Sequence, residues 1–420
     1  MVFGEDTHEL GLGEAVKLAL EYNLSLKKSE IDLEAAAFSE KNLWSVIFPT
    51  ISASAGAGYR RHLFSDIPLP NEGQFYSLGF NVRLGLNAGI PYAMKSIKLA
   101  HKEKLLSYED AKNQLSIQIT KLFYSLVAAD DNLLLLEENF NLAQRISARN
   151  EVSFRNGLVG ELTLTQSRLA AENARYNLSA AKVTHEGNMA EFLAMLGMSL
   201  NENITLLGDI NIVRINPDSE ALINKYLSKR PDIAQKTQEI EKLETSYNQI
   251  SLRARAPSLD LSLNWGSSAF DPFTDSLSAT AQLSIPIDPW IKGTEQSQAA
   301  ARASDQIKKA KLDLEITENS AKTQIRSLSA LLKHSWDSIL IARLSLEAAQ
   351  RSYQLTEQGF NNGTVEQLTL QDARNNMADA RQRLLRSELS YFNMILDLSS
   401  ALNMDWNTLI ETYGVPSEEI

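Results

Sequence analysis

The sequence predicts a mainly α-helical protein that also contains a membrane β-barrel and is built from two tandem structural repeats. Three observations lead to this fold class: a duplicated order of segments, two helical stretches too long for a compact domain, and four short segments in which apolar and polar residues alternate. Glycine and proline are scarce, at 19 and 11 of 420 residues, which favours long helices.

Composition excludes several classes of function. The net charge of -11 argues against a nucleic-acid partner, because phosphate binding requires a basic face. The chain has no cysteine, so disulfides, thiolate catalysis and cysteine metal sites are excluded. The sequence contains no run of about 18 apolar residues, so it predicts no transmembrane helix. Residues 1–10 lack the basic start and apolar run of a signal peptide, and the alternating segments favour a mature exported chain over a cytosolic one.

An internal duplication organises the chain. Residues 154–164 and 360–370 are identical at seven of eleven positions when aligned at a spacing of 206. Near the start of each half, Pro49-Thr50-Ile51 corresponds to Pro257-Ser258-Leu259 at a spacing of 208. A period this long indicates two structural halves rather than a solenoid of short units. We therefore expect one repeat over 1–216 and a second over 217–420.

Each repeat is expected to have the same order of elements. A helix comes first, then two barrel strands, then a long helical hairpin, and the second repeat ends in a short C-terminal tail. The expected bounds are about 8–46, 50–60, 75–87 and 92–197 in the first repeat, and about 218–255, 258–266, 276–287 and 291–403 in the second. The hairpins turn at Asn156-Gly157 and Asn362-Gly363, residues suited to a helix C-terminus. An arm of roughly 64 residues would be about 95 Å long and needs coiled-coil partners.

The strand segments carry the strongest physical pattern. From Tyr76 to Asn87 every second residue is large and apolar, and the residues between them are small or polar. Segments near ten residues long with this alternation are typical of membrane barrels. A soluble antiparallel sheet packed on the helices is the alternative. The Pro- and Gly-broken stretches 61–74 and 267–276 are expected to be cell-surface connections between paired strands.

The number of strands constrains the assembly. Single-chain barrels begin at about eight strands, and an open sheet edge is not tolerated in lipid. Four strands must therefore be pooled between copies of the chain, with about eight from two copies or about twelve from three.

Several motifs in this duplicated order resemble the TolC-like outer-membrane efflux proteins, the outer-membrane channels of tripartite efflux or type I secretion systems. The resemblance covers about 10–404. Its carriers are Lys229-Arg230-Pro231-Asp232-Ile233, the helix-to-strand junction at 253–262, Leu283-Ser284-Ile285-Pro286-Ile287, and the Asn-Gly-x-Val turns at 156–159 and 362–365. Each motif alone is weakly specific, and their duplicated order is the specific feature.

The resemblance implies a homotrimer whose 12-stranded barrel continues into a 12-helix coiled-coil tunnel. It implies a protein of the outer membrane, in contact with its lipid and extending into the periplasm. Such a protein is a passive conduit from the periplasm to the cell exterior, opened with a periplasmic adaptor (membrane fusion) protein and an inner-membrane pump. It is not an enzyme and has no cofactor. The cargo, whether drug, metal, siderophore or protein, is left open by the sequence.

The resemblance also locates candidate sites at the helical turns. Adaptor docking is expected at the two tips, Gly157, Leu158, Val159, Gly160, Gly363, Thr364, Val365 and Glu366, although these glycines could instead only cap helices. Where some members carry a lock of acidic, tyrosine and arginine residues, this chain has Thr163, Phe360, Val365 and Thr369. Asp372 retains one acidic position. The lock is therefore expected to be weaker or built differently.

Asp372 is the main gate candidate, because three copies would form a ring of carboxylates that selects cations and binds a divalent ion. The alternative is a surface aspartate paired with Arg374 or Asn376.

Two other classes of protein are alternatives to this one. An enzyme is disfavoured because the five histidines, His8, His62, His101, His185 and His334, show no metal-ligand spacing, and no G-x-S-x-G motif occurs. We therefore expect no catalytic residue and no metal site. A soluble coiled-coil adaptor or scaffold would explain the helices but not four alternating strands placed symmetrically between them. Extraction that requires detergent would distinguish the two.

Overall fold

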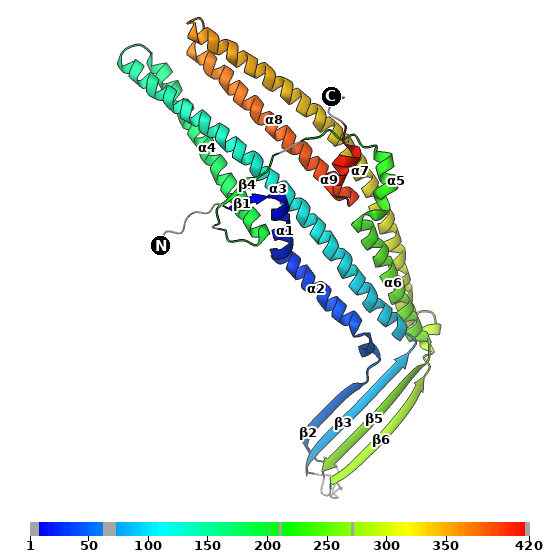
Figure 1. Ribbon diagram of the computed structural model, residues 1–420. Coiled ribbons are helices and arrows are strands. Elements are labelled where there is room, and N and C mark those ends of the chain that lie inside the picture. Colours follow the sequence, from blue (N-terminus) through cyan, green and yellow to red (C-terminus); the bar gives the residue numbers. More distant parts are fainter. Residues whose placement is uncertain (1–7, 62–72, 201, 210–211, 270–272, 416–420) are drawn as a thin grey trace. The chain divides into compact units, whose positions relative to one another are not determined.

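The computed structural model describes residues 8–61, 73–200, 202–209, 212–269 and 273–415, and these fall into two compact units (Figure 1). The strands are β1 His8–Gly11, β2 Thr50–Arg60, β3 Gly73–Asn87, β4 Ile204–Leu207, β5 Ser258–Ala269 and β6 Phe273–Ser284. The α-helices are α1 Leu12–Tyr22, α2 Leu24–Lys41, α3 Ile90–Arg155, α4 Glu161–Leu196, α5 Ser219–Tyr226, α6 Pro231–Arg255, α7 Glu295–Asn361, α8 Gln367–Leu402 and α9 Trp406–Tyr413. Three 3-10 turns are η1 Leu43–Ile47, η2 Leu227–Lys229 and η3 Asp288–Trp290.

One unit, Ile31–Ser107 with Ala234–Thr317, contains a four-stranded antiparallel sheet in the order β2-β3-β5-β6 (Figure 1). Its register sets Ile51 opposite Val82, Leu86 opposite Leu259, and Leu259 opposite Leu283. The large side chains of one face are exposed: Ile51, Tyr59, Tyr76, Leu78, Phe80, Leu261, Leu263, Trp265, Leu277 and Leu283. A soluble sheet packed on helices would bury such a face, so its exposure favours the membrane alternative.

The opposite face of the sheet is polar and carries cross-strand pairs. Asn81 donates a hydrogen bond to Asn264, directly opposite on β5. Arg83 forms an ion pair with Asp260, with 3.0 Å between Nη2 and Oδ1. Both contacts join β3 of the first half to β5 of the second. Cross-strand pairs of this kind stabilise a sheet and help to specify its register.

Ion pairs identify which helices are neighbours in the same unit. Lys104 on α3 reaches Asp32 on α2 at 2.9 Å. Lys242 on α6 reaches Glu103 on α3 at 2.7 Å, and Lys311 on α7 reaches Glu244 on α6 at 3.0 Å. The helices therefore follow the order α2-α3-α6-α7, parallel to the order of the strands. The pairs are solvent-exposed, so each contributes less than about 1 kcal/mol, and apolar packing provides most of the stability.

The other unit holds two buried cores that correspond to each other. In the core of α1, α3 and α4, Ile119, Leu126, Phe192 and Leu196 are fully buried. In the core of α5, α7, α8 and α9, the buried residues 206 positions further along are Ile325, Leu332, Leu398 and Leu402. β1 and β4 pair in parallel at the edge of the first core. The same helix faces are thus buried in both halves of the chain.

The structure divides both of the first helices that the sequence predicted as continuous. The helix expected over 8–46 is broken at Asn23, whose Oδ1 accepts hydrogen bonds from the N–H groups of Ser25 and Leu26 and so caps α2. The helix expected over 218–255 is broken before Pro231, which fits the first position of a helix because it has no N–H to bond. Asn23 thus starts a new helix in the first segment, and Pro231 does so in the second.

The last strand was also predicted too far along the chain. β6 occupies Phe273–Ser284 rather than 276–287. The alternation continues through Ile285 and Ile287, but Pro286 lacks the N–H that a sheet ladder needs. The long helix of the second half accordingly begins at Glu295 rather than 291. Of the expected surface connections, 62–72 and 270–272 lie outside the described residues. Residues 73–74, 267–269 and 273–276 belong to strands, and Arg61 follows the end of β2.

Within the described ranges, no helix combines the length and the apolar composition needed to cross a bilayer.

Tyr391 allows a test of how the second core is held. Its hydroxyl accepts from the N–H of Ile215 at 2.9 Å and donates to the carbonyl oxygen of Val213 at 3.2 Å. Tyr391→Phe leaves the buried N–H unpaired, so we expect a loss of about 1–3 kcal/mol in the free energy of unfolding, measured by urea denaturation. Tyr176→Phe, on an exposed face of α4, is the matched control and should change little. Equal losses in both variants would contradict this role.

Candidate functional sites

The first predicted tip is a helix-capping turn between α3 and α4. Gly157 has a φ of +71°, in the left-handed region. Its N–H donates to the carbonyl of Phe154 at 2.9 Å, and the N–H of Leu158 donates to that of Ser153 at 2.8 Å. These two bonds form a Schellman motif, which satisfies carbonyls left free at the end of a helix. Gly160 then provides the N-cap of α4.

The second tip repeats this geometry between α7 and α8. Gly363 has a φ of +74°, and its N–H donates to the carbonyl of Phe360 at 3.0 Å. The N–H of Thr364 donates to the carbonyl of Gly359 at 2.9 Å. A Cβ on Gly359 would lie 2.6 Å from Val365, so Val365 packs onto the last turn of α7. Glu366 is the N-cap of α8.

The capping role of the two glycines is therefore present at both tips. Docking of a partner would depend on which side chains the tips expose. Leu158 is 74% exposed, an unusual position for leucine, and Gly157, Thr364 and Glu366 are exposed as well. Val159 and Val365 are half-buried beneath them. The tips thus present small, apolar and acidic groups that a partner can reach.

The gate candidates lie in and beside the first turns of α4 and α8. Thr163, Phe360 and Val365 are half-buried, and Thr369 and Asp372 are exposed. Asp372 makes no hydrogen bond or ion pair with any residue in the described ranges, so the alternative pairing with Arg374 or Asn376 is not seen in the single chain. Phe360 and Val365 belong to the packing and hydrogen bonding of the turn, which Asp372 does not join.

Arg374 takes part in a polar cluster that the sequence did not reveal. It is half-buried, and burial lowers the pKa of its guanidinium from the usual value. Tyr353 and Glu357 on α7, with Glu138 and Arg145 on α3, are the charged and titratable groups around it. Tyr353 donates a hydrogen bond to Glu357 at 2.8 Å. Burial is also the main cause of the raised pKa of Tyr353. The cluster joins three helices, which no local pattern along one helix could predict.

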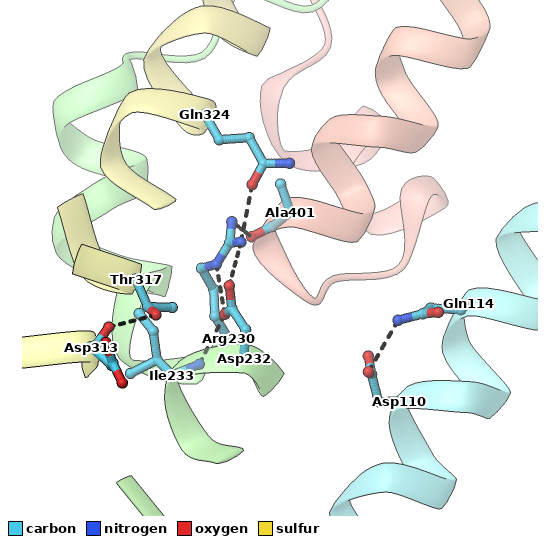
Figure 2. A network of polar contacts seen from close by, with 9 residues as sticks. All are labelled: Asp110, Gln114, Arg230, Asp232, Ile233, Asp313, Thr317, Gln324 and Ala401. Atoms are coloured by element: carbon cyan, nitrogen blue, oxygen red, sulfur yellow. Dashed lines mark hydrogen bonds and ion pairs between the residues drawn. The ribbon is translucent and has the colours of Figure 1, made fainter. Parts of the chain in front are cut away.

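The Arg-Pro-Asp motif forms a second polar site (Figure 2). Arg230 is 8% exposed, and its Nε and Nη2 donate to the two carboxylate oxygens of Asp232 at 3.0 and 2.8 Å. Nη1 donates to the carbonyl of Ala401 at 2.9 Å, and Nη2 also donates to Gln324 at 3.0 Å. Arg230 therefore fastens the start of α6 to the last turn of α8 and to α7.

The electrostatics of Asp232 follow from this contact. Burial alone would raise its pKa, but the hydrogen bonds and charge of Arg230, together with the N–H of Ile233, hold the pKa below its usual value. The carboxylate is therefore ionised at neutral pH and forms a charge-assisted pair with the guanidinium.

The first half contains a counterpart to this contact. Asn23 stands between α1 and α2, and its Nδ2 donates to the carbonyl of Met195 in the last turn of α4 at 2.9 Å. Met195 and Ala401 are corresponding positions of the duplication. An amide in one half and a guanidinium in the other thus fasten equivalent helix ends.

A cavity of about 690 Å³ lies beside Arg230. Asp110 and Gln114 of α3 stand on its far side from Arg230 and are joined by a 3.0 Å hydrogen bond (Figure 2). Amide side chains, among them Asn113, Asn403 and Asn407, make up much of the wall. The carboxylates of Asp110 and Asp232 are both hydrogen-bonded within the chain, so the cavity is a polar recess with internally paired acids.

An antiparallel sheet with one exposed apolar face is joined to two capped helical hairpins, and solved structures of outer-membrane channels have this fold. The Campylobacter jejuni CmeC outer membrane channel matches with a TM-score of 0.78 at 21% identity, over 96% of this chain and 88% of that one. The structure of CusC matches with a TM-score of 0.75 at 16% identity, over 96% and 95%.

Sequence comparisons identify the family. Residues 222–404 match the family model described as outer membrane efflux protein. The toluene efflux pump outer membrane protein TtgC of Pseudomonas putida is 25% identical over 95% of this chain and 84% of that protein. The chain is thus similar to the TolC-like outer-membrane efflux proteins over most of its length. The family predicted from the duplicated motifs is thereby confirmed.

The two tip glycines generate a prediction about local stability. Gly157→Ala or Gly363→Ala forces a side chain into the left-handed region, at a cost of about 1–2 kcal/mol. Hydrogen exchange of the amides of Leu158 and Thr364, which close the Schellman motifs, should become faster. Gly187→Ala, in the middle of α4 with open space around it, is the control and should instead stabilise its helix. Unchanged exchange at the tips would contradict the capping role.

Proposed function

We propose that this outer-membrane efflux protein acts as a homotrimer, in which three copies of the sheet close a barrel of about twelve strands. The helical hairpins of three copies form a coiled-coil tunnel that continues the barrel into the periplasm. The whole is a passive conduit from the periplasm to the cell exterior, built from two tandem repeats over 1–216 and 217–420. One observation carries the proposal: the sheet has an exposed apolar face and two unpaired edges, β2 and β6.

The duplication predicts how the edges pair between copies. Within the chain, Leu86 of β3 lies opposite Leu259 of β5. In the duplication Ile51 corresponds to Leu259. Ile51 pairs with Val82 and Leu259 pairs with Leu283, so Val82 corresponds to Leu283. Four residues further along the chain, Leu86 therefore corresponds to Ile287.

Suppose that β6 pairs with β2 of the next copy in the register in which β3 pairs with β5 within the chain. Residue 287 then lies at the level of residue 51. Leu283 then lies opposite Ala55, and Ala281 opposite Ala57. The apolar faces of the two strands coincide in this register, so the lipid-facing surface is continuous across the junction.

Exposed apolar stripes on the helices support the same assembly. On α2, Leu24, Ile31 and Phe38 are exposed at intervals of seven residues. On α4 a second exposed stripe with this interval consists of Leu162, Leu169, Tyr176 and Val183. A seven-residue repeat of apolar side chains is the pattern of a coiled-coil seam.

α7 supplies complementary surfaces for these stripes. Leu312 and Ile316 are exposed along the part of α7 that lies at the end of the helix order α2-α3-α6-α7, and Ile341 and Leu344 are exposed further along. α2 of one copy would therefore pack against α7 of the next, and α4 against the later part of α7. Contacts between different surfaces of successive copies generate a closed ring, as the barrel requires.

The tips Gly157–Gly160 and Gly363–Glu366 are our proposed docking sites for a periplasmic adaptor protein, which links the conduit to an inner-membrane pump. The exposure of Leu158 supports this assignment, since an exposed leucine at a helix turn has no role in the fold of this chain. The near-identical hydrogen bonding of the two tips would present similar surfaces, so that one adaptor type can engage both.

Asp372 is our proposed gate residue. It is exposed near the start of α8, and in the described residues it is not neutralised by any partner. Three-fold symmetry would place three such carboxylates around the tunnel axis, where they attract cations and bind a divalent ion. Thr163, Phe360, Val365 and Thr369 would shape the same constriction without charge. Such a gate is weaker than one locked by direct ion pairs.

Single-channel recording in planar bilayers tests the conduit and its gate together. The wild-type protein should form cation-selective channels, and Asp372→Asn should lower this selectivity and weaken block by divalent cations, because the ring loses its charge. Glu191→Gln, which removes the same charge from α4 far along the helix from the tip, is the matched control. The absence of channels would overturn the conduit, whereas wild-type selectivity and block in Asp372→Asn would move the ring to Glu161 or Glu366.

A further inference from the structure

The cavity of about 690 Å³ beside Arg230 is formed within a single unit of the chain. α1 contributes Val16 to its wall and α9 contributes Trp406, while α3 and the end of α8 contribute most of the remainder. Binding sites for small molecules have volumes of about 300–1,000 Å³. One copy of the chain therefore provides a complete recess of ligand size, and its lining includes none of the exposed stripe residues of α2 and α4.

The charges around the recess favour a ligand without charge. Arg230 is the one basic residue among the described residues that line it, and Asp232 pairs with its guanidinium. Asp110 and Asp405 add two further carboxylates, so the wall repels phosphates and other anions. A metal ion needs several converging ligands, and the described part of the chain contains no group of three or more acidic or histidine side chains that could hold one.

Hydrogen-bond acceptors of the wall are left free. The Asp110 Oδ2 accepts from Gln114 at 3.0 Å, and its Oδ1 has no partner within the described chain (Figure 2). The Asp405 Oδ2 caps α9 by accepting from the N–H groups of Asn407 and Thr408 at 3.1 and 3.4 Å. The Asp405 Oδ1 is likewise unbonded to any described residue. Each carboxylate thus keeps one oxygen for a ligand that donates a hydrogen bond.

Hydrogen-bond donors of the wall are free as well. The Gln324 Oε1 accepts from Arg230 at 3.0 Å, and its amide nitrogen donates to no described residue. The side chains of Ser400 and Asn407 are exposed and form no hydrogen bond within the described ranges. A hydroxyl group donates and accepts at the same time, so a ligand rich in hydroxyls can satisfy both sets of groups.

Trp406 supplies the apolar part of the recess. Its ring is half-buried and packs against Phe392, with 5.4 Å between the ring centroids and an angle of 78° between the planes. Val16 and Ile117 extend this apolar surface. A sugar ring has a face of C–H groups that packs on an aromatic ring, while its hydroxyls reach the polar groups around it.

From this combination we propose that the recess binds a neutral glycan. Its hydroxyls bond to Asp110, Asp405, Asn407 and Gln324, and one of its rings packs on Trp406. The site belongs to a single copy, so it does not depend on the trimer of the proposed function. In the periplasm such a ligand is either a soluble oligosaccharide or a strand of a polymeric glycan, and both present the same hydroxyl chemistry.

Isothermal titration calorimetry of the purified full chain tests the site. The detergent must have no sugar headgroup, for example lauryldimethylamine oxide, because a maltoside would compete. The probes are three trisaccharides with one backbone: cellotriose, N-acetylchitotriose and its deacetylated, cationic form. At least one of the two neutral probes should bind once per chain. Asp110→Ala and Asn407→Ala should each raise its Kd about fivefold, since each removes a hydrogen bond.

Controls fix the location of the binding. Asn141→Ala, an exposed asparagine further along α3, is the matched control and should leave the Kd unchanged. Binding should also change the tryptophan emission of the wild-type chain, and Trp406→Phe should abolish this change. Circular dichroism verifies that every variant keeps its helical content.

Three results would overturn the glycan site. These are no heat with any probe, binding of the cationic trisaccharide alone, and equal Kd values in the recess variants and Asn141→Ala. Co-sedimentation of the chain with purified cell-wall sacculi, lost in Asn407→Ala, would identify a polymeric glycan as the source. Binding of the soluble trisaccharides without co-sedimentation would identify a free oligosaccharide. Neither result bears on whether the chain forms a conduit, which the bilayer recordings test separately.

Discussion

The unpaired backbone groups along β2 and β6 are the constraint on which the account depends. Each edge strand presents a row of N–H and C=O groups, and burial of such groups in lipid without partners costs several kcal/mol apiece. Among the described residues these strands form one four-stranded sheet, and in the proposed trimer other copies complete its edges. Ring closure then determines which helix faces meet. In the same proposal the exposed stripes on α2 and α4 become interfaces between copies.

The two halves of the duplication repeat the same local structural features. Both hairpins end in a Schellman motif around a left-handed glycine, and both long helices bury equivalent faces. The ends of α4 and α8 carry the left-handed residues Gly197 and Asn403 at corresponding positions. The halves differ in the side chain that binds the end of the returning helix: Asn23 binds the end of α4, and Arg230 binds the end of α8. Asp232 keeps its charge beside Arg230, which holds this buried guanidinium in a paired state.

Much of the fold was predictable from local patterns. Strict alternation located β3, and Asn-Gly located both hairpin turns, because these depend on neighbouring residues only. The periodicity of apolar residues gives wrong bounds where a capping residue or a proline interrupts an element. This is the case at Asn23 for the first helix and at Pro286 for β6. The cluster around Arg374 and the contacts of Arg230 joined residues from three helices, so no spacing along the chain revealed them. The sequence shows the Arg-Pro-Asp motif only as a resemblance, because the contacts of Arg230 that explain it lie on other helices.

Disulfide trapping between neighbouring copies tests most directly whether the strand edges close a ring. The chain has no cysteine, so the double variant Ala57→Cys, Ala281→Cys introduces the only thiols. The register proposed for β6 and β2 places these positions opposite each other in adjacent copies. Mild oxidation in detergent should give a covalent trimer on denaturing gels and no larger product. Ala57→Cys with Gln282→Cys, whose side chains lie on opposite faces, is the control and should cross-link poorly. Monomers alone, or an open-ended ladder of higher species, would contradict closure by three copies.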